Sequence, residues 1–151
     1  MLDYKKADSK DLNQLNKISY ESEAYWGYDE KFMGIFKEKY AIDEDFLRQS
    51  ETYVMTDDEG IIGFFSIKNH GIEGTLEYFY IRVDQIGRGM GRKMWKLMLE
   101  VCLMLDVESL SWVTSPGAIP FYTKMGSNRV GEVSSTIDPS LKIPAFKFQL
   151  K

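Results

Sequence analysis

Three glycines at alternate positions, Gly87, Gly89 and Gly91, separate a predicted strand from a predicted helix. Glycine adopts backbone angles that other residues resist, and it lets a ligand approach the chain closely. The first N–H groups of a helix have no intrahelical acceptor, and the helix dipole adds positive potential there. The segment therefore predicts an anion site, most typically for phosphate. Three cations lie in the same segment: Arg88, Arg92 and Lys93.

Four interpretations of this turn compete. A P-loop requires Lys-Ser/Thr after its last glycine, but Arg92, Lys93 and Met94 follow here. A dinucleotide fingerprint requires its third glycine where this chain has Arg92. The two remaining interpretations are a site for the pyrophosphate of coenzyme A and a tight strand–helix turn that binds nothing.

The spacing of apolar residues predicts the elements around the turn. Helices are expected from Asp8 or Ser9 to about Ala24, around Phe32–Tyr40, from Gly91 to about Leu105, and from Ser115 to Met125. Strands are expected over Leu2–Ala7, Glu51–Thr56, Ile61–Ile67, Thr75–Val83, Glu108–Thr114, Arg129–Ser134 and Ala145–Leu150. The order βααβββαβαββ indicates a mixed α/β fold, and we expect one domain over residues 1–151.

Composition narrows the function classes. With 151 residues, 44% of them hydrophobic and 28% charged, the chain is typical of a globular domain rather than a disordered one. Cys102 is the only cysteine and His70 the only histidine, so we expect no internal disulfide and no metal site. We expect Cys102 to be buried and inert, and His70 to lie in a turn. No apolar run suits a membrane span or a signal peptide, so we expect a cytoplasmic protein without a membrane partner.

The charge is unevenly distributed. The net charge of −4 divides into −7 over residues 1–60 and +3 over residues 61–151. This asymmetry either indicates two electrostatic faces, with anions meeting the second half, or is simply a solvated acidic surface. The acidic total argues against a nucleic-acid partner.

The sequence resembles the GNAT superfamily of acyl-CoA-dependent N-acyltransferases, whose cofactor motif is Q/R-x-x-G-x-G/A. Gly89 and Gly91 fill the two small positions, whereas Ile86 stands at the Q/R position and Gln85 is one place away. A second family motif, a helix of the pattern A-x-x-F-Y-x-K-x-G, matches Ala118 to Gly126. The resemblance implies a central, mostly antiparallel, twisted sheet that is splayed at the cofactor site and flanked by helices.

The resemblance also implies acetyl-CoA as cosubstrate. The backbone of Ile81 to Val83 would pair with the pantetheine arm, and an N–H near Ile81 would donate to the thioester oxygen. The residues assigned to the cofactor are Ile81, Arg82, Val83, Ile86, Gly87, Arg88, Gly89, Met90, Gly91, Arg92, Lys93, Ser115, Tyr122 and Lys124.

Tyr122 is the predicted general acid for the leaving thiolate, because it holds the family's tyrosine position and its phenol is a suitable proton donor. A core aromatic is the alternative, since Ala118, Phe121 and Met125 share its helical face. Glu77 is the predicted base. It precedes Ile81 by four residues, which puts both side chains on one face of a regular strand. An exposed strand residue, or a structural pair with a cation, is the alternative for Glu77. Glu73 and the hydroxyls of Tyr78 and Tyr80 are rival candidates for the base, although Tyr78 and Tyr80 lie on the opposite face of a regular strand.

The acceptor amine is expected to meet the early helices, where Trp26 and Tyr28 flank the helix-breaking Gly27. Aromatic rings and the acidic first half suit a cationic amine. The sequence therefore predicts an N-acetyltransferase that moves acetyl from acetyl-CoA to a primary amine of a small molecule or peptide by direct attack. A non-catalytic acyl-CoA-binding or sensing module is the alternative function. The sequence does not determine the oligomeric state, for which a homodimer is one of the possibilities.

Overall fold

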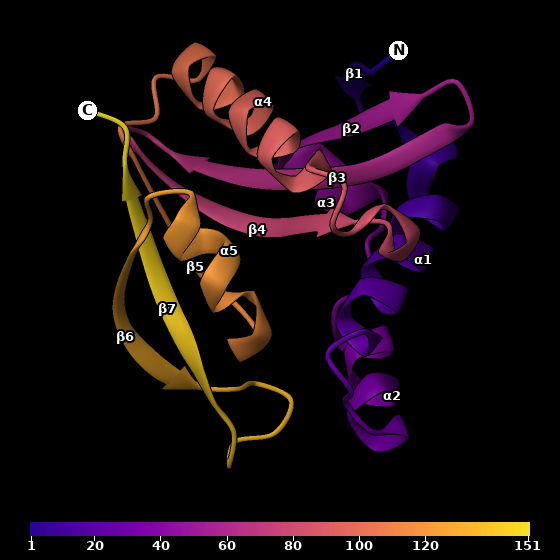
Figure 1. The fold of residues 1–151 in the computed structure, drawn as a ribbon, viewed down its shortest axis with the longest axis vertical. Coiled ribbons are helices and arrows are strands. Elements are labelled where there is room, and N and C mark those ends of the chain that lie inside the picture. Colours follow the sequence, from indigo (N-terminus) through magenta and orange to yellow (C-terminus); the bar gives the residue numbers. More distant parts are fainter.

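The computed structural model describes all 151 residues, and its seven strands form one sheet (Figure 1) in the order β1-β2-β3-β4-β5-β7-β6. Neighbouring strands are antiparallel except β4 and β5, which are parallel, so the expected mostly antiparallel sheet is confirmed. The strands are β1 (Asp3–Lys6), β2 (Glu51–Asp57), β3 (Gly60–His70), β4 (Glu73–Ile81), β5 (Ser109–Val113), β6 (Asn128–Ser134) and β7 (Lys142–Gln149).

Five α-helices and three short 3-10 turns connect the strands. The helices are α1 (Leu12–Ala24), α2 (Glu30–Lys39), α3 (Glu44–Gln49), α4 (Met90–Met104) and α5 (Ile119–Lys124). The 3-10 turns are η1 (Ser9–Asp11), η2 (Val83–Gln85) and η3 (Pro116–Ala118). Aspartate side chains cap α2 and α3, because Asp29 accepts from the N–H of Phe32 and Asp43 from that of Phe46.

The structure corrects the predicted elements at four points. The predicted order omits α3, whose six residues are too few to show a helical period. His70 is the last residue of β3 rather than part of a turn, since it pairs with Glu73. Val83 begins η2 instead of ending β4. The helix predicted from residue 115 divides into η3 and α5, because Pro120 is tolerated only in a first helical turn.

Two apolar cores lie on opposite faces of the sheet. On one face α1 brings Leu15 and Ile18 against Phe64 and Tyr78. On the other face α4 contributes Met94, Trp95, Leu97, Met98, Val101 and Cys102 to the larger core. Cys102 is buried as expected, and burial raises the pKa of its thiol to about 12.

An aromatic cluster joins α4 and α5 to the second half of the sheet. Trp112 of β5 lies 5.0 Å from Tyr122 and 5.9 Å from Phe146 between ring centroids, and Trp95 of α4 packs edge-on to Trp112. These rings fill the space beneath α5 and thereby fix its position relative to β4 and β5.

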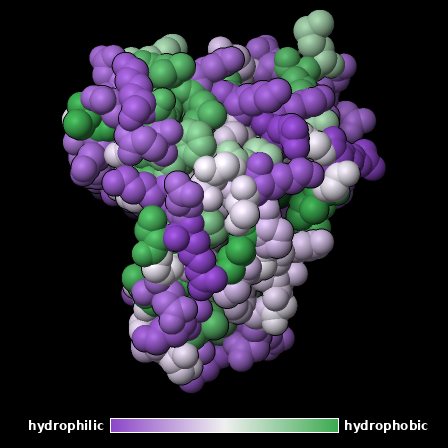
Figure 2. Space-filling model, turned by 60° about the vertical axis from the view of Figure 1, so that its left-hand side comes forward, coloured by the Kyte–Doolittle hydropathy of each residue, from purple (hydrophilic) through white to green (hydrophobic).

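The surface carries both polar and apolar residues. Figure 2 shows the apolar residues in separate patches among polar ones on one face of the molecule. Exposed apolar side chains include Val113, Val130 and Val133 of β5 and β6. None of the helices is both long and apolar enough to cross a membrane.

Gly91 allows α4 and α5 to approach each other. A Cβ atom at this position would lie 2.8 Å from Cε1 of Phe121, which is closer than real contacts allow. Phe121 cannot easily move aside, because Phe79, Trp95 and Tyr122 surround its ring. Gly91 is therefore explained by helix packing, whatever the turn binds.

Gly91→Ala is expected to destabilise the fold by about 1–3 kcal/mol, the usual cost of overpacking. In a Phe121→Leu background the same change should instead stabilise by up to ~1 kcal/mol, because alanine favours helix and the ring no longer obstructs it. Urea unfolding of the two single variants and the double variant measures the coupling. Equal effects of Gly91→Ala in both backgrounds would show that Phe121 is not the obstacle.

Candidate active site

Strand β4 loses its β5 neighbour after three residues. Glu73, Gly74 and Thr75 pair with β5, whereas the segment Leu76–Ile81 pairs with β3 alone. In Figure 1, β5 and β7 run away from β4 at a large angle. The sheet is thus splayed at its centre, as the family resemblance implied.

The open edge of β4 presents backbone groups without a strand partner. The N–H of Arg82 donates to the carbonyl of Ile62 at 2.7 Å, so Arg82 faces β3. Backbone N–H and C=O groups point to alternate sides along a strand, so the N–H and C=O groups of Phe79 and Ile81 point away from β3. Ser22 Oγ of α1 donates to the Ile81 carbonyl at 2.8 Å. The N–H groups of Phe79 and Ile81 remain for a ligand in the gap.

A cavity of about 900 Å³ occupies the gap. At one end it reaches Gly87, Gly89 and Gly91 at the beginning of α4, and at the other end Phe36 of α2. The connection from β6 to β7 borders this second end through Thr136, which contacts Lys39, the last residue of α2, and Tyr40, which follows it. One continuous space therefore joins the glycine-rich turn to the early helices across the splayed sheet.

The beginning of α4 has the geometry of an anion site. Gly89 is the N-cap residue at φ 80°, and Gly87 has φ 83°. Both have open space where a Cβ would stand, so their positive φ angles rather than packing require glycine. The N–H groups of Met90, Gly91 and Arg92 have no acceptor in the protein. Three convergent donors at a helix N-terminus suit a phosphate.

The predicted cofactor residues divide into two groups. Ile81, Ile86, Gly87, Gly89, Gly91, Arg92, Ser115, Tyr122 and Lys124 line the cavity. Arg82, Val83, Arg88, Met90 and Lys93 do not line it. Arg82 is held by Asp84 at 2.6 Å and by the Ile61 carbonyl, so its charge is already used within the protein. Gln85 also lines the cavity, beside Ile86.

Tyr122 lies in the cavity wall and in the larger core at once. It is 5% exposed, and its ring packs against Trp112, Phe121 and Phe146. Burial raises the pKa of its phenol, and a polar contact with Thr114 offsets part of that rise. The packing shows the core aromatic ring that was the alternative for Tyr122, and the role of its hydroxyl as general acid stays a prediction.

Glu77 lies on a different face of β4 from the one expected. Ser66 pairs with Tyr78 and Ile67 with Leu76, so Glu77 is the extra residue of a β-bulge. The bulge reverses the alternation, and the side chain lies beside Lys68 at 3.6 Å. Lys68 lies over the ring of Phe46, and Phe46 packs with Tyr78 on the face of the sheet that α1 covers. Ile81 packs on the opposite face, which α4 covers, so Glu77 and Ile81 do not share a face. Glu77 still lines the cavity, but with a cation as its partner.

Trp26 and Tyr28 both reach the segment that follows β5. The ring of Trp26 covers Gly117 so closely that a Cβ there would lie 2.3 Å from it. Tyr28 is outside the cavity lining, and its hydroxyl donates to Ser115 Oγ at 2.8 Å. The two aromatic side chains thus connect the end of α1 to the beginning of η3 across the splay.

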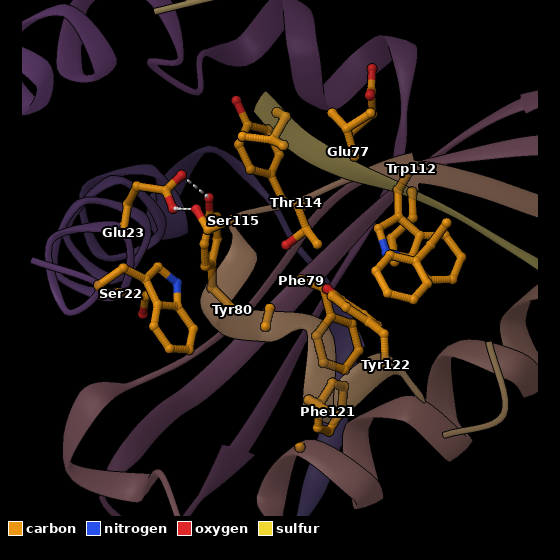
Figure 3. A pocket seen from close by; sticks show the side chains of 18 of the residues that line it. Ser22, Glu23, Glu77, Phe79, Tyr80, Trp112, Thr114, Ser115, Phe121 and Tyr122 are labelled. Atoms are coloured by element: carbon orange, nitrogen blue, oxygen red, sulfur yellow. Dashed lines mark hydrogen bonds between the residues drawn. The ribbon is translucent and has the colours of Figure 1, made fainter. Parts of the chain in front are cut away.

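Glu23 is a cavity residue that the sequence analysis did not single out. Its Oε1 accepts from Ser115 Oγ at 2.8 Å and its Oε2 from the Tyr80 hydroxyl at 3.2 Å (Figure 3). Burial raises the pKa of this carboxyl, and the two hydrogen bonds offset part of the rise. The only sequence signal for it is an acidic residue inside the aromatic run Tyr20–Tyr28.

Figure 3 shows how the polar groups are arranged. Glu23, Ser115 and Tyr80 form one group, and Tyr122 lies with Thr114 and Trp112 on the other side of the view. The cavity thus offers an anion site, unpaired backbone donors, a buried phenol and a carboxylate.

Comparisons with known proteins agree with this geometry. The family description "Acetyltransferase (GNAT) domain" matches residues 14–136. No curated protein sequence matches the chain. Among solved structures, the PaiA N-acetyltransferase from Thermoplasma acidophilum in complex with coenzyme A is similar at TM-score 0.79, with 15% identity over 99% of both chains.

Two further structures share the fold. The ribosomal-protein-S18-alanine N-acetyltransferase from Escherichia coli has TM-score 0.75 and 15% identity, covering 100% of this chain and 95% of its own. An aminoglycoside 6'-N-acetyltransferase complexed with coenzyme A has TM-score 0.76 and 10% identity, covering 99% of this chain and 97% of its own. Together with the family match over most of its length, the splayed sheet and the glycine-rich turn identify the chain as a member of the GNAT acetyltransferase family.

Proposed function

We propose that the protein is an acetyl-CoA-dependent N-acetyltransferase whose acceptor is a primary amine of a small molecule or peptide, attacking the thioester directly. The observation that carries the proposal is the single cavity joining the free N–H groups of α4 to the open edge of β4. The cavity thus has the two parts that acyl-CoA needs: the beginning of α4 for its phosphates and the open edge of β4 for its extended polar arm.

The residues present fit acetyl-CoA. The N–H groups of Met90, Gly91 and Arg92 would hold the pyrophosphate. Those of Phe79 and Ile81 would pair with the pantetheine arm as a neighbouring strand does. The indole N–H of Trp112 is buried without a hydrogen-bond acceptor, and Trp112 borders the cavity. A carbonyl of the bound ligand would supply the missing acceptor and remove the free-energy cost of a buried, unpaired donor. When bound, acetyl-CoA supplies an activated acetyl thioester.

Tyr122 would act on the leaving sulfur. Because burial raises its pKa, the phenol is protonated at neutral pH and can donate to a thiolate. The aromatic rings around it hold the hydroxyl in one place, which general acid catalysis requires.

The acceptor would enter from the end of the cavity formed by α1 and α2. Trp26 and Phe36 supply apolar and aromatic surface there, and residues 1–60 carry a net charge of −7. This combination favours a cationic amine over a neutral or acidic acceptor.

Gly89→Ala is predicted to weaken acetyl-CoA binding, because the added methyl group would project into the open space through which the pyrophosphate would approach the turn. The matched control is Gly71→Ala in the β3–β4 turn, since Gly71 has nearly the same φ (78° against 80°) and equally open space. Both variants should lose similar stability from the positive φ. Thermal melting with acetyl-CoA at 100 times its Kd should stabilise the wild type and Gly71→Ala by ~2.7 kcal/mol. An equal gain for Gly89→Ala would refute phosphate binding at this turn.

Tyr122→Phe is predicted to lower turnover by ~100- to 10,000-fold, the usual contribution of general acid catalysis. Acetyl-CoA affinity should change little, because the ring and its packing remain. Thiol release with a panel of primary amines is the measurement, and the loss should shrink for an acyl donor with a better leaving thiol. Turnover close to that of the wild type would make Tyr122 a core residue. Binding of acetyl-CoA by the wild type without thiol release from any amine would favour the non-catalytic module.

A further inference from the structure

Glu23 is a carboxylate without a counter-charge. None of the ion pairs in the structure includes it, whereas Glu77, the other carboxylate of the cavity wall, has Lys68. Both of its oxygens accept hydrogen bonds, but from the neutral hydroxyls of Ser115 and Tyr80. A half-buried carboxylate held in this way lacks the cation that usually accompanies a charge removed from water.

The other polar groups around Glu23 do not supply that cation. Four phenols lie close enough to feel its charge: burial raises the pKa of each, and the Glu23 carboxylate adds to the rise. They come from β4, from α5 and from the segment after α1, and they are Tyr78, Tyr80, Tyr122 and Tyr28. The segment after β5 adds the Ser115 hydroxyl, which itself receives a hydrogen bond from Tyr28. The chain Tyr28, Ser115, Glu23 and Tyr80 therefore fixes the carboxylate rigidly and leaves its charge unbalanced.

The carboxylate also lies close to the place where the reaction would occur. Its neighbour in sequence, Ser22, donates to the carbonyl of Ile81, the last residue of the open β4 edge. Tyr80, which donates to Glu23, precedes Ile81 by one residue. Glu23 thus borders the cavity beside the backbone donors that would receive the thioester.

From this geometry we infer, on the basis of the proposed function, that Glu23 binds the ammonium group of a cationic acceptor and takes its proton before attack. Ser115 and Tyr80 are positioning residues that hold the two carboxylate oxygens. The missing counter-charge in the free protein is then the substrate itself.

The proposed step balances as follows. The ammonium R–NH3⁺ gives one proton to the Glu23 carboxylate and becomes R–NH2. The nitrogen lone pair forms the N–C bond to the acetyl carbonyl, and the C–S bond breaks with its electron pair going to sulfur. The nitrogen loses its second proton to solvent, the thiolate gains one from Tyr122, and Tyr122 is reprotonated from solvent. Glu23 returns its proton to solvent, so the net products are the acetamide, the free thiol and one proton.

Glu23→Gln is the test, because glutamine keeps the size of the side chain and can still hydrogen-bond both hydroxyls. Glu21→Gln is the matched control on the same helix, since Glu21 is exposed and outside the cavity lining. At pH 7, kcat/KM for a cationic amine should fall ~100- to 10,000-fold in Glu23→Gln and stay unchanged in Glu21→Gln. Glu23→Asp should retain part of the activity, and acetyl-CoA should shift the melting temperature of all variants equally.

The pH profile distinguishes proton transfer from a merely structural role. In the wild type, kcat/KM should decline as pH falls through the raised pKa of Glu23, because the base must be ionised. In Glu23→Gln the decline set by the pKa of Glu23 should disappear. The kcat/KM of this variant should follow the fraction of free amine in solution, and should therefore keep rising toward the pKa of the amine itself. Hydroxylamine, whose nitrogen is unprotonated at neutral pH, should react with wild type and Glu23→Gln at similar rates.

Stability provides a second readout. Because folding raises the pKa of Glu23, its contribution to stability is present below the pKa of the unfolded chain and is lost as pH rises through the folded pKa. Glu23→Gln should therefore melt at an equal or higher temperature than wild type at pH 7. A lower melting temperature together with uniformly reduced activity on all acceptors, hydroxylamine included, would make Glu23 structural and overturn the inference.

The remaining outcomes separate the inference from the proposed function. If wild type releases thiol with amines and Glu23→Gln does so equally well, the inference is wrong and the proposed function stands. A loss confined to Glu77→Gln would assign the base to Glu77 instead. If wild type releases no thiol with any amine or with hydroxylamine, the proposed function itself fails.

Discussion

The separation of β5 from β4 after three paired residues is the constraint on which the rest of the structure depends. It leaves a central strand with one open edge inside the protein, where an unpaired backbone donor costs about 1–3 kcal/mol. Ser22 satisfies one carbonyl at this edge, that of Ile81. The remaining donors are stable only beside solvent or a ligand, so the same feature that opens the cavity also determines what it can bind.

Two packing arrangements keep the sheet open. The aromatic cluster of Trp95, Trp112, Tyr122 and Phe146 fills the space beneath α5, so β5 cannot move back toward β4. On the other face, Trp26 lies over Gly117 and spans the gap from the end of α1. Apolar burial, the main stabilising contribution in folding, thus compensates for the lost strand pairing. It also places the Tyr122 hydroxyl and the Glu23 carboxylate in the wall of one cavity.

The parts of the site predicted from sequence are those determined by local physics. The positive φ at Gly87 and Gly89, the helix start after them and the position of Tyr122 on a short helix all follow from neighbouring residues. The β-bulge at Glu77 did not follow, because a single extra residue changes the face of a strand without leaving a sequence signal. Glu23 was missed since its partners, Ser115 and Tyr80, are 92 and 57 residues away in the chain. Its importance lies in tertiary contacts and in the absence of a cation.

Amide hydrogen exchange along β4, with and without acetyl-CoA, tests most directly whether the open edge receives the acyl donor. The amides of Phe79 and Ile81 should exchange far more slowly with the ligand, because they gain an acceptor. The amide of Tyr80, which faces β3, should change only as much as the general stabilisation of the fold requires. Protection that alternates in this way along three successive residues is the predicted result. Protection confined to the beginning of α4, with Phe79 and Ile81 no slower than Tyr80, would contradict the account.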